Sequence, residues 1–118
     1  MSNKLIFNLT IKIDHAVEKE WLDDLINKFL PSITDGKVIL SSQINKLLLE
    51  QKEEDNTYAI QFVFPSLDLF KERKISTMES FLNDMDADYR GKYVYFGTMM
   101  EMVHCNNKMI NNPKISLN

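Results

Sequence analysis

The residues of this chain best suited to chemistry are two histidines and one cysteine. His15 lies at the predicted start of a helix, where the helix dipole lowers the pKa of an imidazole, and it is a candidate base. His104 and Cys105 are adjacent on a predicted strand, so their side chains leave opposite faces and cannot both bind one metal ion without distortion. A zinc site built from these three residues has no ligand-spacing motif to support it. We therefore expect no metal, no cofactor and no catalytic residue.

A second set of candidates combines one amide with aromatic and thioether side chains: Gln61, Tyr93, Tyr95 and Met99. Alternation along the two predicted strands that carry them directs all four away from the helices, on one face of the sheet. Polar groups within an aromatic and thioether surface suit a small apolar ligand. Protein interfaces use the same side chains, so we favour a dimer face and keep a ligand cleft as the alternative.

A helix from Asp14 to Leu30 is the most strongly predicted element. Its apolar residues recur at helical spacing, and its charged residues fill the other side. Asp14 is expected to cap the first turn, and Pro31 is expected to end the helix because proline has no backbone N–H. One short helical turn is allowed after Pro31, before the turn signal that ends at Gly36. Trp21 lies in the middle of the apolar stripe, so we interpret it as a core residue rather than as the wall of a ligand cleft.

Strands and a second helix complete the pattern. Period-two alternation and apolar runs predict four strands, at residues 5–13, 38–49, 57–64 and 93–104. The parity of the apolar residues changes near Asn45 and Lys46, which predicts a β-bulge or a sharp bend in the second strand. The second helix is expected to begin after Ser66 and to end near Arg90, with Gly91 as the left-handed residue beyond it.

The elements follow one another in the order β-α-β-β-α-β, which is typical of ferredoxin-like α+β domains. We therefore predict a four-stranded antiparallel sheet with two helices on one face. Residues 1–105 are expected to form a single domain, with a polar loop over 50–56, and residues 106–118 a polar C-terminal tail.

The last predicted strand carries apolar side chains on both of its faces. We assign Val94 and Phe96 to the face covered by the helices, and Tyr93, Tyr95 and Met99 to the other face. Two helices cover only one face, so the second apolar face needs another cover. A second copy of the same sheet is the economical cover in a chain this short, and we predict a homodimer.

Composition limits the partners of the chain. Apolar residues make up 44% and charged residues 26%, close to the average of globular domains. A net charge of −3 supplies no basic field, so we expect neither a nucleic-acid partner nor a membrane partner. RNA-recognition domains share the order of elements, but strand 57–64 lacks the basic residue and glycine of their third-strand motif. A single cysteine allows no internal disulfide and favours a reducing, cytoplasmic setting.

Three segments of the chain resemble a small bacterial family known only as a domain of unknown function: DHAVEKEWLDDLINKFLPSITDGK, TYAIQFVFPS and GKYVYFGTMMEMV. The resemblance spans residues 4 to 104. The family is similar in outline to the dimeric α+β barrel proteins, so the resemblance implies a ferredoxin-like dimer without an assigned reaction. Its members often carry a histidine where this chain has Phe29, so any acid-base role of that histidine is lost here.

Two functions follow from these observations. We favour a non-catalytic dimeric module that binds a partner or a small apolar ligand. The alternative is a cofactor-free enzyme of the dimeric α+β barrel type that acts on a small apolar substrate. An enclosed void lined by Gln61, Tyr95 and Met99, with His15 or His104 facing it, would favour the enzyme.

Overall fold

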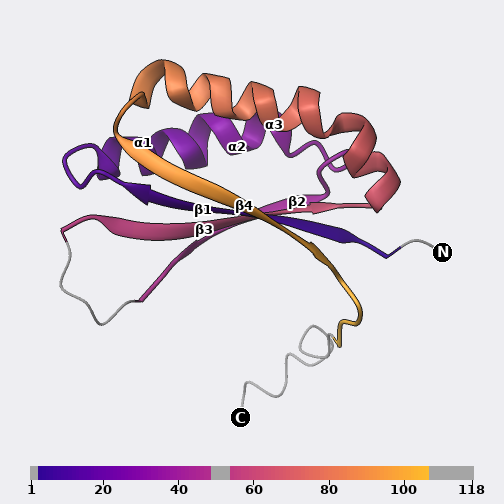
Figure 1. Cartoon of the computed structure of the whole chain (residues 1–118). Helices are drawn as coiled ribbons and strands as arrows, with labels where there is room; N and C mark the ends of the chain where they lie inside the picture. The colour runs from indigo at the N-terminus through magenta and orange to yellow at the C-terminus, as the bar shows by residue number, and fades with distance from the viewer. Residues whose placement is uncertain (1–2, 49–53, 107–118) are drawn as a thin grey trace, which may run out of the picture.

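The computed structural model describes residues 3–48 and 54–106, so most of the predicted loop over 50–56 and of the predicted tail lies outside the described residues. The elements are β1 (Leu5–Ile13), α1 (Glu18–Asp24), the π-helical segment η1 (Leu25–Phe29), α2 (Leu30–Ile33), β2 (Ser41–Lys46), β3 (Asn56–Phe64), α3 (Leu67–Tyr89) and β4 (Tyr93–Glu101). The sheet has the strand order β2-β3-β1-β4, and each strand is antiparallel to its neighbours. The helices lie on one face of the sheet (Figure 1). The fold is therefore α+β and ferredoxin-like, as the order of elements predicts.

The first helix begins later than the sequence predicts. α1 starts at Glu18, and Val17 before it makes no side-chain capping bond. Asp14 instead holds the turn that follows β1, where its Oδ1 accepts a hydrogen bond from the N–H of Ala16 at 2.8 Å. The predicted capping role of Asp14 is therefore wrong, because its carboxylate is used one turn earlier.

The first helix also ends later than predicted. It passes from α1 through η1 into α2 and ends at Ile33, with Pro31 inside α2. In η1 the N–H of Leu30 donates to the carbonyl of Leu25, five residues back, which is the wider π-helical turn. Pro31 lies at the start of α2, where its missing N–H is tolerated. The predicted end at Pro31 is wrong because the helix changes its hydrogen-bond pattern immediately before the proline.

β2 is shorter and more regular than predicted. It begins at Ser41, because Oδ1 of Asp35 holds a turn by accepting hydrogen bonds from the backbone N–H groups of residues 37–39. The register of β2 with β3 is unbroken through Asn45 and Lys46, so the predicted bulge is wrong.

The chain around α3 agrees more closely with the sequence. Ser66 caps this helix, since its Oγ accepts a hydrogen bond from the N–H of Leu69 at 3.1 Å. Gly91 follows the helix with a φ of 78°, the left-handed conformation expected there. β4 then ends at Glu101, three residues before the predicted His104.

Trp21 lies in the core between the helices and the sheet, which confirms its interpretation. Its side chain is 0% exposed, and its ring centroid lies 5.3 Å from that of Tyr58 in β3. Its Nε1–H points to the sulfur of Met85 in α3, at 3.3 Å. The surrounding core is made by apolar side chains that include Leu9, Ile11, Ile13, Leu25, Ile60, Phe62, Phe64, Phe70 and Phe81.

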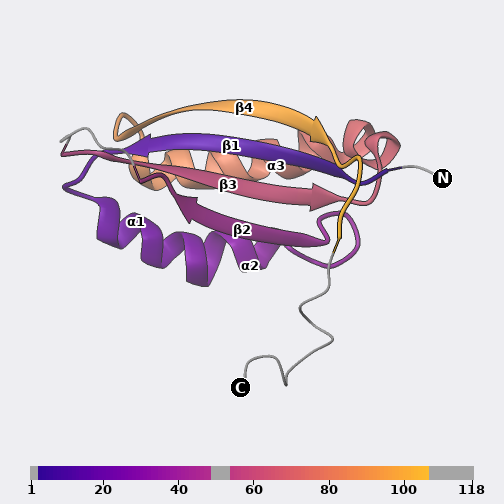
Figure 2. The same ribbon diagram turned by 90° about the horizontal axis from the view of Figure 1, so that it is seen from below.

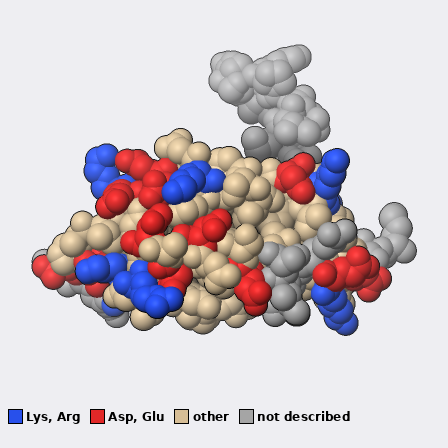
Figure 3. Space-filling model, turned by 90° about the horizontal axis from the view of Figure 1, so that it is seen from above, with Lys and Arg blue, Asp and Glu red and all other residues tan. Residues whose placement is uncertain are grey.

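The two faces of the sheet have different surroundings. Figure 2 shows the sheet from the side that no helix covers, with the helices behind it. The outer surface of the helical layer carries intermixed acidic and basic side chains (Figure 3). None of the helices described here is long and apolar enough to cross a membrane.

Candidate functional site

The pairing register decides which face of the sheet each candidate residue occupies, because residues directly opposite each other on antiparallel strands share a face. Tyr93 lies opposite Ile13 and Tyr95 opposite Ile11. Both isoleucines are fully buried against the helices. Tyr93, Tyr95 and, by alternation, Met99 therefore face the helical side. Their predicted assignment to the other face is wrong.

The apolar pattern of β4 misleads because an edge strand is exposed on both faces, so apolar residues do not mark its inner face. Tyr93 suits the helical side because its Oη donates a hydrogen bond to Oδ1 of Asp86 in α3 at 3.1 Å. Burial, together with the hydrogen bond to Asp86 and its negative charge, raises the pKa of Tyr93 to about 12. The rings of Tyr93 and Tyr95 lie 6.0 Å apart. The hydrogen bond of Tyr93 to Asp86 fastens β4 to α3.

Met99 lies at the other end of β4. It lines a groove of about 240 Å³ with Leu5, Leu67 and Glu101, where β4 ends and α3 begins. Gln61 is on the opposite face of the sheet, so no described hollow combines Gln61, Tyr95 and Met99.

The face of the sheet away from the helices, which we call the open face, carries Gln61. Val94, Phe96 and Met100 share it and are 67%, 62% and 37% exposed. The register places on this face Ile6, Asn8, Thr10 and Lys12 of β1, Ser41, Gln43 and Asn45 of β2, Thr57, Ala59, Gln61 and Val63 of β3, and Val94, Phe96, Thr98 and Met100 of β4. Lys12 is the only ionisable side chain among these strand residues. The open face is therefore apolar and polar but almost uncharged.

Asn8 lies at the centre of the open face, between Gln61 of β3 and Thr98 of β4. Its Nδ2 donates to Oγ1 of Thr10 at 3.1 Å. Its Oδ1 is buried and has no hydrogen-bond partner among the described residues. Buried polar atoms in native proteins nearly always have a partner, so this oxygen is a point on the open face that still needs a hydrogen-bond donor.

A second hollow lies at the edge of the sheet, between β2 and the end of the first helix. This groove has a volume of about 290 Å³. Ile26, Leu30 and Pro31 form its helical wall, and Ser42 and Ile44 form its strand wall. The hydroxyl groups of Thr34 and Ser42 lie 2.8 Å apart across the groove. It is mainly apolar, and none of the described residues that line it is titratable.

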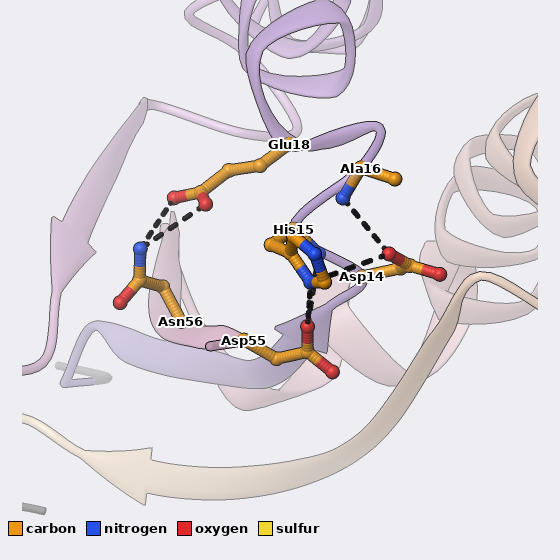
Figure 4. A network of polar contacts seen from close by, with 6 residues as sticks. All are labelled: Asp14, His15, Ala16, Glu18, Asp55 and Asn56. Atoms are coloured by element: carbon orange, nitrogen blue, oxygen red, sulfur yellow. Dashed lines mark hydrogen bonds and ion pairs between the residues drawn. The ribbon is translucent and has the colours of Figure 1, made fainter. Parts of the chain in front are cut away.

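A polar network joins the turn after β1 to the residues before β3 (Figure 4). Oδ1 of Asp55 accepts hydrogen bonds from the backbone N–H of His15 and from its Nδ1, both at 2.9 Å. Oδ1 of Asp14 lies 3.8 Å from the same Nδ1. The hydrogen bond to Asp55 is the main reason why the pKa of His15 is raised above its usual value. The predicted lowering by the helix dipole is wrong, because His15 precedes the helix and lies beside carboxylates.

Asp14, His15 and Asp55 also have their ligand atoms within 4.8 Å of one another, a spacing that could hold a metal ion. Hydrogen bonds to the backbone and to the imidazole already account for the arrangement. His104 lies at the other end of the sheet, where its Nε2 contacts Oδ1 of Asn106 at 3.0 Å. The structure therefore separates His15 from His104 and Cys105, and the three residues do not form one site.

Glu18 extends the network toward the core. Its carboxylate accepts hydrogen bonds from Nδ2 of Asn56 at 2.9 and 3.1 Å and from the hydroxyl of Tyr58. Burial, followed by the contact with Glu18, raises the pKa of Tyr58. The sequence gives no local signal for these pairs, because Asp55 and Asn56 are 40 and 38 residues from their partners along the chain.

Solved structures share this fold at low sequence identity. An ethd-like protein from Ralstonia eutropha JMP134 has a TM-score of 0.62 and 14% identity over 91% of this chain and 98% of its own. A dimeric ferredoxin-like protein from an uncultured marine organism has a TM-score of 0.59 and 14% identity over 88% and 99% of the two chains. A variant of SnoaB, a cofactor-independent oxygenase from Streptomyces nogalater, has a TM-score of 0.60 and 12% identity over 91% and 100%. These similarities establish the fold alone.

A search of curated proteins finds no match to this chain. The family described as Domain of unknown function (DUF4286) matches residues 4–103, which is nearly all of the described chain. The protein therefore belongs to this family of unknown function.

Proposed function

We propose that this protein is a non-catalytic module that forms a homodimer through the open face of its sheet. The observation that carries the proposal is the row of exposed apolar side chains on that face, Val94, Phe96 and Met100. Several exposed large apolar side chains on one face are unfavourable in water and are typical of an interaction site.

The charge of the open face supports a second copy as its partner. A twofold interface brings each residue close to the same surface of the other chain, so like charges would repel there. Among the described strand residues of the open face, Lys12 is the only ionisable one, and it lies near the end of β1. Two copies can therefore pack their open faces together without burying a set of like charges against each other.

Asn8 supports the same arrangement. Its buried Oδ1 needs a hydrogen-bond donor, and burying such an atom without one costs about 1–3 kcal/mol. A second open face would bring the amide and hydroxyl groups of Gln61 and Thr98 toward the centre of the interface. Gln61 is therefore our candidate polar contact, and a small ligand between the sheets is the competing occupant. The similar protein from a marine organism, which is described as dimeric, also supports this assembly.

The packing of the helices on the sheet favours a non-catalytic role over a cofactor-free oxygenase. Large side chains fill this interface, among them Trp21, Phe62, Phe70 and Phe81, each nearly or fully buried. An enzyme for a small apolar substrate needs a cavity with convergent polar groups. The described hollows lie instead at the margins of the fold.

The test compares two neighbouring residues of β4 that lie on opposite faces. Phe96→Glu places a charge on the open face and should give a folded monomer. Tyr95→Glu is the matched control, since Tyr95 is 48% exposed on the helical side and should tolerate a charge without dissociation. Sedimentation at micromolar concentration should show the wild type and Tyr95→Glu at about twice 13.8 kDa. Circular dichroism should show that both variants are folded.

The register reverses the outcome that the sequence predicts for this pair, in which Tyr95 faces the partner and Phe96 faces the core. A monomeric wild type would overturn the proposal. So would a dimer that Tyr95→Glu dissociates and Phe96→Glu leaves intact. A dimer that tolerates both charges would place the interface elsewhere.

A further inference from the structure

The outer edge of β2 has backbone groups available for another strand. Among the described strands, β2 has β3 as its only neighbour. The N–H of Leu47 donates to the carbonyl of Thr57 at 2.9 Å, in register with the pairs of β2 and β3. Hydrogen-bonded and non-hydrogen-bonded pairs alternate along an antiparallel ladder. Ser42 and Ile44 therefore direct their N–H and C=O groups away from β3, toward the free edge.

The groove between β2 and the end of the first helix runs beside Ser42 and Ile44. Its volume of about 290 Å³ is at the lower limit of pockets for small molecules, and it suits one or two aliphatic side chains better. Ile26 forms part of its wall and is 54% exposed, although it lies in the middle of the first helix. Free strand hydrogen bonds next to an apolar groove are the two features of a site for an extended peptide segment.

The helical wall of the groove is also the irregular part of the first helix. Ile26 lies in η1, and Pro31, five residues later, has no N–H to donate to its carbonyl. Single π-helical turns are frequent at functional sites. The irregular hydrogen bonding therefore coincides with the groove.

The chain itself supplies a suitable segment. Residues 114–118, Lys-Ile-Ser-Leu-Asn, alternate polar and apolar side chains with a period of two, which is the pattern of a strand with one apolar face. Ile115 and Leu117 are the apolar pair. Pro113 directly precedes the segment, a position that a strand tolerates because its ladder starts after it.

The end of β4 also lies at the end of the sheet from which this segment could reach β2. β4 ends at the end of the sheet where β2 begins, since Glu101 pairs with Leu5, Leu5 with Phe64, and Ser41 with Val63. Figure 2 shows the chain after β4 crossing the ends of the neighbouring strands toward the start of β2. From β4 to a position beyond β2 is four strand spacings, about 19 Å. Residues 107–113 span up to about 23 Å when extended.

We propose that the edge of β2 and its groove bind residues 114–118 of the same chain as an added strand. Ile115 and Leu117 enter the groove against Ile26 and Leu30. Ser116 lies on the side of the open face, beside the polar Gln43. The added strand covers the one exposed edge of β2, a kind of edge that otherwise invites pairing with other chains. This inference does not rest on the proposed dimer.

Amide hydrogen exchange of the full chain, followed by NMR, tests the proposal. In the wild type, the amides of Ser42 and Ile44 should be protected, because the added strand accepts their hydrogen bonds. Leu117→Asp should speed their exchange by at least about tenfold, since it removes a buried leucine from the groove. Ser116→Asp adds the same charge one residue away, on the other side of the strand, and should have little effect. The amide of Leu47, bonded to Thr57, should not change in either variant.

Three outcomes would overturn the proposal. The first is exchange of Ser42 and Ile44 at the rate of free amides in the wild type. The second is a Ser116→Asp variant that releases them as strongly as Leu117→Asp does. Protection that vanishes on dilution would assign the edge to a second copy instead. Repeating the measurement in the Phe96→Glu background separates the two proposals, because that substitution tests the open face and leaves the edge of β2 unchanged.

Discussion

Both faces of the sheet carry apolar side chains, but they differ in what they meet. On the helical side Ile11, Ile13 and Phe62 are fully buried by Trp21 and its neighbours. On the open face Val94 and Phe96 are more than half exposed. The same side chain type is therefore a core residue on one face and an interface candidate on the other. Apolar character alone does not distinguish the two, and the pairing register does.

The face of the sheet that the helices cover, which we call the covered face, should differ most from the open face in how much stability is lost when a large side chain is removed. Trp21→Ala deletes the fully buried indole that packs on Tyr58 and contacts Met85, and it should cost about 3–5 kcal/mol of unfolding free energy. That is a large share of the roughly 5–15 kcal/mol of a typical domain. Urea denaturation followed by circular dichroism measures the loss.

Ile26→Ala is the matched control for this prediction, because Ile26 belongs to the same helical run but is exposed. It should cost less than about 1 kcal/mol. Equal losses for the two variants would contradict the assignment of the core to the covered face.

Much of the covered face follows from the sequence, because its elements are periodic. The first helix and β3 each bury one side. Hydrophobic periodicity therefore predicts the buried stripe around Trp21 and the buried alternate residues of β3, which are Tyr58, Ile60, Phe62 and Phe64. Gln61 follows from the same alternation, since it lies between two buried residues of a central strand.

The faces of β4 do not follow from the sequence for the opposite reason. β4 is an edge strand whose residues are exposed on both sides, so either parity fits its apolar pattern. Only its pairing with β1, at least 80 residues earlier in the chain, settles the register. The contacts of Asp55 with His15 are likewise non-local, and no spacing rule predicts them.

A pair of substitutions in β4 compares the helical side and the open face within one strand. Gly97 faces the helical side, where the ring of Phe7 lies over it, and a Cβ at this position would come within 2.6 Å of that ring. Gly97→Val should therefore cost about 1–3 kcal/mol through overpacking. Thr98→Val, one residue along on the open face, meets no such ring and is the control.

Thermal or urea unfolding of this pair is measured in the Phe96→Glu background, where the proposed interface on the open face is absent and Thr98 makes no contact with a second copy. Gly97→Val should lower stability while Thr98→Val leaves it nearly unchanged. A destabilising Thr98→Val with a neutral Gly97→Val would mean that the register of β4 is shifted by one residue and that its two faces are exchanged.

The smallest effect is expected at the end of the sheet, where His15 and Asp55 belong to neither face. Asp55 raises the pKa of His15, and His15 lowers the pKa of Asp55. A raised histidine pKa adds stability that is complete below the pKa of the unfolded chain, about 6.5, and is lost as pH rises through the folded value. The lowered pKa of Asp55 adds stability that is lost as pH falls through its folded value. Both groups are exposed, so solvent screens the pair and the change in stability should be small.

An NMR titration of the imidazole is the direct measurement. The midpoint of His15 should lie above about 6.5 in the wild type and fall in Asp55→Asn, while Asp23→Asn on the surface of α1 should not move it. An unchanged midpoint in Asp55→Asn would show that the network in Figure 4 does not hold the imidazole in solution.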